Sequence, residues 1–404
     1  MIGEVIELNV GNFAHGGHCV ARIDGRVVFV RHTLPGERVR ARVTGSGGGG
    51  KFLRADAIEI LEAAPDRVTP PCSYAGVCGG CDWQHASLDA QRRGKESIVR
   101  ELLRKNVSAE ILESFTVRAV EGDVDGLGWR TRVRFAVDSE GHAGLRPHRS
   151  HDVLTIDRCL IAHPAITALD ITAEVWPQAR EVLAVAPSSG EALAQADPRH
   201  TGTRVLEKAA GREWKVDFTG FWQVHPGAAD ALVNVVGDFA QPTKGEHILD
   251  LYSGVGLFAG AFAENVGVGG RIDAVEVDAG ACANARRNVH DLPFVHLHHA
   301  DVLEWLRVKA IKRADIVILD PPRTGCGPAV VKAIVKLRPR VIVYVACDPA
   351  PLARDLAAFA EHGWKVDEII GLDMFPMTQH LECVVRLTRH ESAAEPTQNS
   401  TRHN

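Results

Sequence analysis

The sequence predicts a multidomain α/β protein whose C-terminal part is built on a doubly wound parallel sheet. Beyond residue 223, four apolar strand candidates alternate with stretches of helical periodicity, which is typical of such a sheet; they span 247–252, 271–277, 314–320 and 341–347. Before residue 64, five short strand-like runs are separated by Gly- and Pro-containing turns, which indicates a small antiparallel β-barrel. The 404 residues leave room for two or three domains of about 150 residues each.

Composition excludes several classes of protein. With 46 Lys and Arg against 51 Asp and Glu, the net charge is −5, so the chain is no basic nucleic-acid coat and any such contact comes from local patches. No apolar run approaches the roughly 18 residues of a membrane span, and the first residues lack the pattern of a secretory signal. We therefore expect a cytoplasmic protein with no membrane partner, whose nine cysteines are reduced.

Changes in pattern along the chain divide it into four segments. We expect a barrel, a mostly-β central domain, the doubly wound domain and a disordered polar tail, at 1–64, 65–222, 223–389 and 390–404 respectively. Within the central domain, helical patterns are expected at about 88–105 and 166–183.

The first strand of the doubly wound domain ends in a ligand-binding pattern. Asp250 is followed by Gly254 and Gly256 in a G-x-G-x-x-A turn, and Glu276 ends the next strand as an acid that can bind ribose hydroxyls. This pattern serves both nicotinamide cofactors and S-adenosylmethionine. Asp250 favours S-adenosylmethionine because a carboxylate would repel a pyrophosphate. A tight turn with no ligand is the alternative.

Two further motifs follow later strands of the same predicted sheet. Asp320 opens the sequence DPPRTG, where two prolines stiffen the chain and make Arg323 available to a substrate. Cys347 ends the next strand and precedes a helix, whose N-terminus is expected to lower the pKa of the thiol. Ligands bind outside the carboxyl ends of such strands, so we expect these groups to face one cleft with Cys347 as a nucleophile. A buried core cysteine is the alternative.

A second group of cysteines lies in a Gly- and Pro-rich turn. Cys72, Cys78 and Cys81 lie close together in the chain, and Cys159 is a candidate fourth member. Three thiols so close together in a reducing compartment indicate a metal site. Zinc and an iron–sulfur cluster both accept four thiolates, and the spacing leaves the choice between them open.

Three arginines alternate along a predicted strand of the central domain. Arg130, Arg132 and Arg134 are spaced by two residues, so we expect all three on one face of the strand. They are a candidate phosphate-binding stripe, with a solvated strand face as the alternative.

Taken together, these motifs resemble the tRNA/rRNA (uracil-5-)-methyltransferase family over nearly the whole chain. Residues 1–62 resemble the RNA-binding TRAM domain, and PPCSYAGVCGGCDWQH with Cys159 resembles the family's [4Fe–4S] site. FWQVHPG, DLYSGVGLF, DPPRTG, ACDPAPLARD and HLECVVRL resemble its cofactor, substrate, nucleophile and general-base motifs. The chain departs from the common pattern at four positions, His225, Ser253, Leu257 and Asp348.

The resemblance implies a fold, an activity and a role for each residue. The C-terminal domain would be a Rossmann-like class I methyltransferase that forms 5-methyluridine, with 23S ribosomal RNA as the first expected substrate and tRNA as the alternative. Cys347 would add to uracil C6, which makes C5 able to accept the methyl group, and Glu382 would then remove the C5 proton. S-adenosylmethionine would be held by Gln223, Asp250, Tyr252, Gly254, Gly256, Glu276, Asp301 and Asp320.

Two other classes of function remain open. A nicotinamide-dependent oxidoreductase would leave DPPR and ACDP without a role, and a non-catalytic RNA-binding protein would not need both Cys347 and Glu382. For the methyltransferase we expect a monomer that acts on a single-stranded or flipped-out uridine. Its RNA contacts are expected in the barrel and at Arg130, Arg132, Arg134 and Arg323.

Overall fold

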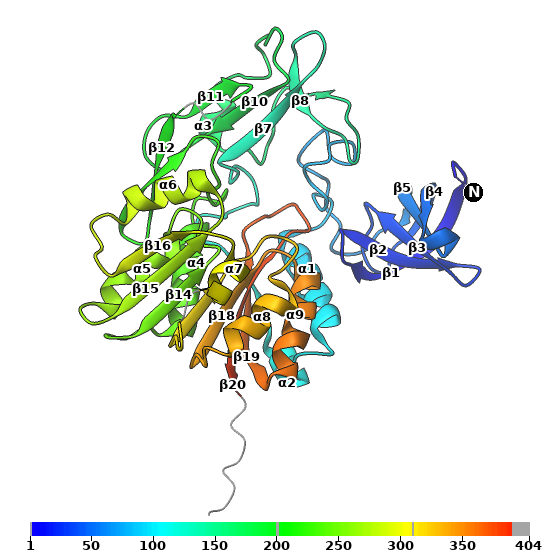
Figure 1. Ribbon diagram of the computed structural model, residues 1–404. Helices are drawn as coiled ribbons and strands as arrows, with labels where there is room; N and C mark the ends of the chain where they lie inside the picture. Colours follow the sequence, from blue (N-terminus) through cyan, green and yellow to red (C-terminus); the bar gives the residue numbers. More distant parts are fainter. Residues whose placement is uncertain (1, 199–201, 309–310, 390–404) are drawn as a thin grey trace, which may run out of the picture.

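The computed structural model describes residues 2–198, 202–308 and 311–389, so the expected tail at 390–404 lies outside the described residues. Figure 1 shows the N-terminal barrel to one side, the central strands above and the large sheet with its helices below. Within the described ranges, every helix is too short or too polar to cross a membrane.

The N-terminal barrel closes through five strands in the order β1-β2-β3-β5-β4, which confirms the predicted barrel. It is not wholly antiparallel, because β3 and β5 pair in parallel. The strands are β1 (Val5–Ala14), β2 (His18–Ile23), β3 (Arg26–Arg31), β4 (Arg38–Gly47) and β5 (Phe52–Glu62). Alternate apolar side chains such as Val28, Val30 and Val39 point inward and are fully buried. Phe13 packs against Trp83 with 4.9 Å between ring centroids, which joins the barrel to the cysteine-containing segment.

The large sheet has eight strands in the order β16-β15-β14-β17-β18-β20-β19-β6. Its members are β14 (His247–Leu251), β15 (Arg271–Glu276), β16 (Val295–His299), β17 (Ile316–Leu319), β18 (Val341–Ala346), β19 (Trp364–Asp373), β20 (Glu382–Arg389) and β6 (Val117–Ala119). The strands from β14 to β18 are parallel and β20 is antiparallel to β18. The chain leaves β14 toward β15 on one side and reaches β17 on the other, so the strand order reverses at β14.

Helices cover both faces of this sheet (Figure 1). They are α4 (Ala228–Ala240), α5 (Leu257–Val266), α6 (Ala279–Asn288), α7 (Val302–Val308), α8 (Gly327–Val335) and α9 (Pro349–Glu361). Along β14, Ile248 belongs to one apolar core and Leu249 to the other, as expected for a strand buried on both sides. The four strands predicted from the sequence are confirmed.

Part of the central segment forms a core of its own around Phe135, Ile166 and Val182, and other parts join the cores of the large sheet. Its strands are β7 (Arg132–Val137), β8 (Ala143–Leu145), β9 (Leu154–Thr155), β10 (Glu181–Val185), β11 (Leu193–Ala196), β12 (Arg204–Ala209) and β13 (Arg212–Asp217). Its helices are α1 (Leu88–Leu103), α2 (Ala109–Ser114) and α3 (Pro164–Thr167). Strand β6 pairs with β19 of the large sheet, and Trp214 of β13 shares a core with Phe262 of α5. The predicted boundary at residue 223 therefore does not separate two hydrophobic cores.

The prediction of a helix over 166–183 is wrong beyond Thr167. The helix α3 ends near Thr167, and Asp170 adopts a left-handed conformation with φ = 48°. Pro177 cannot donate a helical hydrogen bond, and the chain enters strand β10 at Glu181.

Candidate active site

The carboxyl ends of four parallel strands meet the start of β20 at one edge of the large sheet. Leu251 and Leu319 are Cα partners in β14 and β17, so Tyr252 and Asp320 follow side by side. On the other side of β17, Leu319 pairs with Tyr344 of β18, three residues before Cys347. The sequence predicted that the groups at this edge share one cleft.

Cys347 and Glu382 lie opposite each other on neighbouring antiparallel strands. Ala346 of β18 is the Cα partner of Cys383 of β20, and continuing that register by one residue pairs Cys347 with Glu382. Directly opposite residues project to the same face, with Cβ atoms about 5 Å apart. Cys347 is half-buried and Glu382 is buried. A thiol and a carboxyl group therefore face the same point from two strands.

The environment of Cys347 disfavours its charged form. Burial raises the pKa of the thiol to about 11, with the negative charge of Glu382 as the next cause. Arg323 opposes this shift, while Asp320 and Asp348 add to it. The helix N-terminus was predicted to lower this pKa. That prediction is wrong because burial outweighs the effect of the helix N-terminus. Asp348, which caps α9 by accepting the N–H of Ala350 at 2.9 Å, adds a smaller contribution in the same direction.

Asp320 and Glu382 form a pair of carboxyl groups in the cleft. Burial raises the pKa of Asp320 to about 7, and the negative charge of Glu276 contributes. Burial also raises the pKa of Glu382 well above its usual value, followed by the negative charge of Asp320, while Arg323 opposes the shift. Two carboxylates are costly to ionise together, so this pair can hold a proton near neutral pH.

The loop after β14 has the backbone shape and the free polar atoms of a ligand site. Tyr252, Gly254 and Gly256 all have positive φ, at 65°, 55° and 91°. A left-handed tyrosine is unfavourable and is held here by its N–H bond to the Val275 carbonyl at 2.9 Å. The N–H of Gly254 donates to Glu276 Oε2 at 2.9 Å, which joins the predicted glycine loop to the predicted ribose-binding acid.

Two buried polar atoms, one near the end of β14 and one in the loop after it, are available to bind polar groups of a cofactor. Asp250 Oδ2 accepts the N–H of Ala259 at 2.9 Å, but within the described residues its Oδ1 and the hydroxyl of Ser253 are buried without a partner. Such atoms are costly unless a ligand or water completes them. Burial raises the pKa of Asp250 to about 7.

Two further residues were predicted to bind the cofactor. Gln223 is half-buried and follows the buried Trp222. Asp301 is exposed beyond β16, where its carboxylate accepts the N–H of Glu304 at 3.0 Å at the start of α7. Its negative charge also contributes to the raised pKa of Tyr252, after burial and Cys326.

A cavity of ≈ 100 Å³ beside Cys347 contains residues that the sequence analysis missed. Its lining includes Cys347, Arg323 and Asp348, together with His15, Lys95, Gln379 and His380. His15, in the turn between β1 and β2, lies with Nε2 3.1 Å from Asp348 Oδ1. Of these four residues, only Gln379 and His380 had a local signal, because His380 is the first residue of the predicted general-base motif and Gln379 directly precedes it.

The four cysteines line a second cavity, of ≈ 250 Å³. Cys72, Cys78, Cys81 and Cys159 share it with Arg130, Arg134, Arg146 and Arg158. Over the parts of the chain that are described, no three His, Cys, Asp or Glu residues form a group that could hold a single metal ion. Thiols with guanidinium groups around one cavity nevertheless suit a larger, negatively charged group.

The predicted arginine stripe is not formed. Arg132 is buried, where its guanidinium contacts Glu207 Oε1 and the carbonyls of Phe218 and Gly220, each at 3.1 Å. Arg134 is exposed and paired with Glu181, and Arg130 lines the cysteine cavity. The assignment of Arg132 to RNA phosphates is therefore wrong. Alternation places residues on one face of a strand, and here other chain segments cover part of that face.

Comparisons with known families agree with this geometry. Residues 1–58 match the model of the TRAM domain. Residues 210–390 match the model of the tRNA (uracil-5-)-methyltransferase family, and they include the glycine loop, Asp320, Cys347 and Glu382.

Full-length relatives and a solved structure extend the agreement to the whole chain. An RNA methyltransferase of Streptomyces avermitilis is 44% identical, with 96% of this chain and 98% of that protein covered. One from Bifidobacterium longum is 33% identical over 95% and 96%. The tRNA (uracil-54, C5)-methyltransferase of Pyrococcus abyssi, solved with S-adenosyl-L-homocysteine, shares the fold with a TM-score of 0.71 at 23% identity, covering 95% of this chain and 100% of that one. The chain is an RNA methyltransferase and belongs to the (uracil-5-)-methyltransferase family.

Proposed function

We propose that the protein methylates C5 of a uridine in RNA through a covalent bond between Cys347 and C6 of the uracil ring. The opposed positions of Cys347 and Glu382, one residue beyond the paired Ala346 and Cys383, are the observation that carries this proposal. A nucleophile and a base are needed on the two adjacent carbons of the substrate, and the two strands present one of each.

The chemistry follows from the two side chains. The Cys347 thiolate adds to C6, and the electron pair of the C5–C6 double bond passes to C5 and O4 as an enolate. Arg323 is the cation of the cleft that can oppose this charge. C5 then forms a bond to the methyl group, whose former carrier leaves as a neutral thioether. Glu382 takes the C5 proton, the double bond reforms and the thiolate is expelled.

S-adenosylmethionine supplies the electrophilic methyl group in this proposal. The positive φ values of the loop after β14, the Gly254–Glu276 bond and the unpartnered Asp250 Oδ1 support its binding there. Asp250 and Glu276 would hold polar groups of the cofactor, Tyr252 and Gly256 would line it, and Asp320 would face it from β17.

Replacing the nucleophile tests the proposed function. RNA with 5-fluorouridine at the target should trap the enzyme, because fluorine cannot leave as a cation and the thiol cannot be expelled. A labelled-RNA band shifted on a denaturing gel reports the adduct. Cys347→Ala should abolish the band, and Cys326→Ala, which changes a half-buried cysteine beside the DPPR turn, should retain it. A shifted band that persists in Cys347→Ala would overturn the proposal.

We also propose that Cys72, Cys78, Cys81 and Cys159 hold a [4Fe–4S] cluster, with zinc as the alternative. Four thiols that line one cavity of ≈ 250 Å³ together with four arginines support this proposal. Both a zinc ion and an iron–sulfur cluster accept four thiolates.

The colour and metal content of the protein test the cluster. Protein purified without oxygen should be brown and contain about four iron atoms per chain if one [4Fe–4S] cluster is bound. Stoichiometric zinc in colourless, fully active protein would contradict the assignment.

The identity of the RNA stays a prediction. We propose 23S ribosomal RNA as the substrate, with tRNA as the alternative that the family description and the Pyrococcus enzyme favour. Mapping 5-methyluridine by mass spectrometry in both RNAs from a deletion strain decides between them. The missing modification should be in 23S RNA, and loss from tRNA alone would contradict this choice.

A further inference from the structure

The hairpin turn that leads to Glu382 is held from outside along most of its length. Leu372 of β19 is the Cα partner of Glu382, so the turn follows Asp373, the last residue of β19, and ends directly before the proposed base. It also carries Gln379, His380 and Leu381 into the cavity beside Cys347. The position of this turn therefore determines where the base and part of the cavity wall lie.

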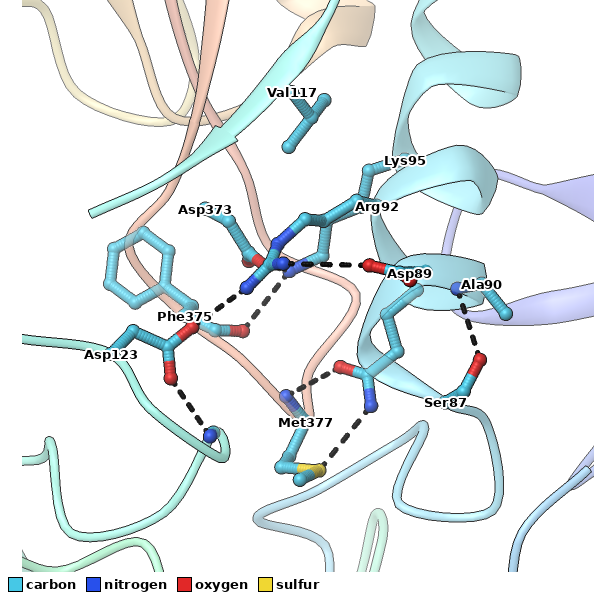
Figure 2. Close-up of polar contacts among 12 residues, drawn as sticks. Ser87, Asp89, Ala90, Arg92, Lys95, Val117, Asp123, Asp373, Phe375 and Met377 are labelled. Atoms are coloured by element: carbon cyan, nitrogen blue, oxygen red, sulfur yellow. Dashed lines mark hydrogen bonds and ion pairs between the residues drawn. The ribbon is translucent and has the colours of Figure 1, made fainter. Parts of the chain in front are cut away.

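Buried charges of α1 fix the start of the turn (Figure 2). Lys95 Nζ donates to Asp373 Oδ1 at 2.5 Å and to the Phe375 carbonyl at 3.1 Å. Arg92 donates to Asp373 Oδ2 at 3.2 Å and to Asp123 at 2.9 Å. The side chains of Lys95, Asp373 and Asp123 have no exposed surface.

Further hydrogen bonds fix the middle and the end of the turn. Gln91 accepts the N–H of Met377 at 2.8 Å and donates to its sulfur at 3.3 Å. The Met377 carbonyl accepts the N–H groups of Asp82 and Trp83, both at 3.0 Å. Gln379 accepts the N–H of Gly16 at 3.0 Å and donates its own to Asp82 at 3.3 Å. Helix α1, the segment after Cys81 and the barrel thus all hold the same few residues.

A buried ion pair is a poor device for stability alone. The desolvation of Lys95 and Asp373 costs several kcal/mol per ion, and apolar residues of equal volume often serve as well. Fixed charges with several directed hydrogen bonds do allow fewer conformations of the backbone they hold. Lys95 donates both to Asp373, at the end of β19, and to the carbonyl of Phe375 two residues later. These two bonds favour one backbone conformation of the turn.

We propose that Lys95 and Asp373 are positioning residues for Glu382, which hold the turn so that the carboxyl group reaches the C5 proton of the substrate. This inference rests on the proposed function. Neither residue takes part in the addition of Cys347 or in methyl transfer. Their loss should therefore slow the last step of the reaction and leave the earlier steps intact.

Two measurements on Lys95→Met separate the last step from the earlier ones. Trapping by 5-fluorouridine RNA requires the addition of Cys347 to C6 and the transfer of the methyl group, but no removal of a C5 proton. At saturating RNA and cofactor, the rate of trapping should therefore stay within about twofold of the wild type. Turnover on normal RNA should fall by about 10- to 100-fold, the scale of a misplacement of about 1 Å. A methylated protein–RNA adduct should accumulate during turnover, as it should in Glu382→Gln.

A double variant and a neighbouring variant complete the test. Lys95→Met/Asp373→Asn removes both charges and leaves no lone buried ion of this pair, so it should melt cooperatively and show the same defect in the last step. Arg93→Ala breaks an exposed ion pair with Asp66. Arg93 lies two residues before Lys95 in α1, and this variant should behave as the wild type.

The outcomes distinguish this inference from the proposed function. Equal loss of trapping and turnover in both Lys95 variants would mean a general structural role and overturn it, as would unchanged turnover. Adduct accumulation in Glu382→Gln but not in Lys95→Met would refute the positioning role alone. Normal turnover of Glu382→Gln would refute the proposed function and this inference with it.

Discussion

Cys347, the proposed nucleophile, lies in surroundings that favour its protonated form. A thiol pKa of about 11 leaves little thiolate at neutral pH, so substrate binding has to change the environment or the reaction has to use the small charged fraction. The negative charges around the thiol come from Glu382, Asp320 and Asp348. Of these, Asp348 has no role in the proposed chemistry.

Asp348→Asn should therefore make the enzyme faster at neutral pH. The thiol pKa is raised, so the rate of 5-fluorouridine trapping should increase with pH toward 11, and removing one negative charge should move this rise to lower pH. We expect a gain of about twofold to fivefold at pH 7.5. Asn caps a helix about as well as Asp, so the stability of the protein should change little.

Glu361→Gln is the matched control for this measurement. It removes the same charge at the opposite end of α9, where Glu361 is exposed. Its profile of trapping rate against pH should overlay that of the wild type. A profile for Asp348→Asn that also overlays the wild type would show that Asp348 does not influence the thiol.

The positions of Cys347 and the glycine loop at strand ends could be predicted because each follows a strand with a distinctive local pattern, whereas Glu382 was expected only from the family resemblance. Parallel-sheet topology brings such strand ends together, whatever their separation in sequence. His15 and Lys95 reach the same cavity from the barrel and from α1, and no local pattern of the sequence encodes those contacts. The direction of the Cys347 pKa shift was missed because burial outweighs the helix N-terminus.

At the scale of elements, β7 shows what alternation can and cannot predict. Its period of two correctly indicates a strand, since Arg132 to Ala136 pair with β10. The pattern does not reveal that Glu207 of β12 and the segment 218–220 cover Arg132. Which elements cover a face is a property of tertiary structure, so a buried arginine and a solvated one look alike in the sequence.

Arg132→Ala should destabilise the protein and leave its RNA contacts unchanged. The change leaves the carboxylate of Glu207, whose side chain is 4% exposed, buried without its ion-pair partner. It should lower the free energy of unfolding by about 3 kcal/mol. Chemical denaturation checks this value. The dependence of RNA affinity on salt should stay that of the wild type.

The exposed Arg134 provides the comparison. Arg134→Ala removes a pair that is largely solvated and should change the free energy of unfolding by less than about 1 kcal/mol. A flatter salt dependence of RNA binding in Arg132→Ala, with unchanged stability, would restore the phosphate-binding interpretation.

At the scale of the whole molecule, part of the central segment belongs to the hydrophobic core on one face of the catalytic sheet. Trp214 of the central part is fully buried, and a Cβ added at Gly260 of α5 would come within 2.5 Å of its ring. The architecture of barrel and doubly wound sheet was predictable from periodicity. The packing of central residues against this sheet was not predictable, because β6, α1 and β13 join the large sheet and its helices from earlier parts of the chain.

Residues 223–389 expressed alone should therefore not fold. The fragment lacks Trp214 over α5 and the strand β6 at the edge of the sheet, so it should show no cooperative thermal transition by circular dichroism. The full chain should melt cooperatively under the same conditions. A fragment with a sharp transition would contradict the shared core and support an independent domain that begins at residue 223.

The most direct test of the account is the fate of RNA on the Glu382→Gln enzyme. The account predicts that addition and methyl transfer proceed while the C5 proton stays, so a covalent adduct with unmodified target RNA should accumulate. Mass spectrometry of the digested adduct should find a methylated uridine attached to the peptide that contains Cys347. Release of normal 5-methyluridine at the wild-type rate, or attachment to a different cysteine, would contradict it.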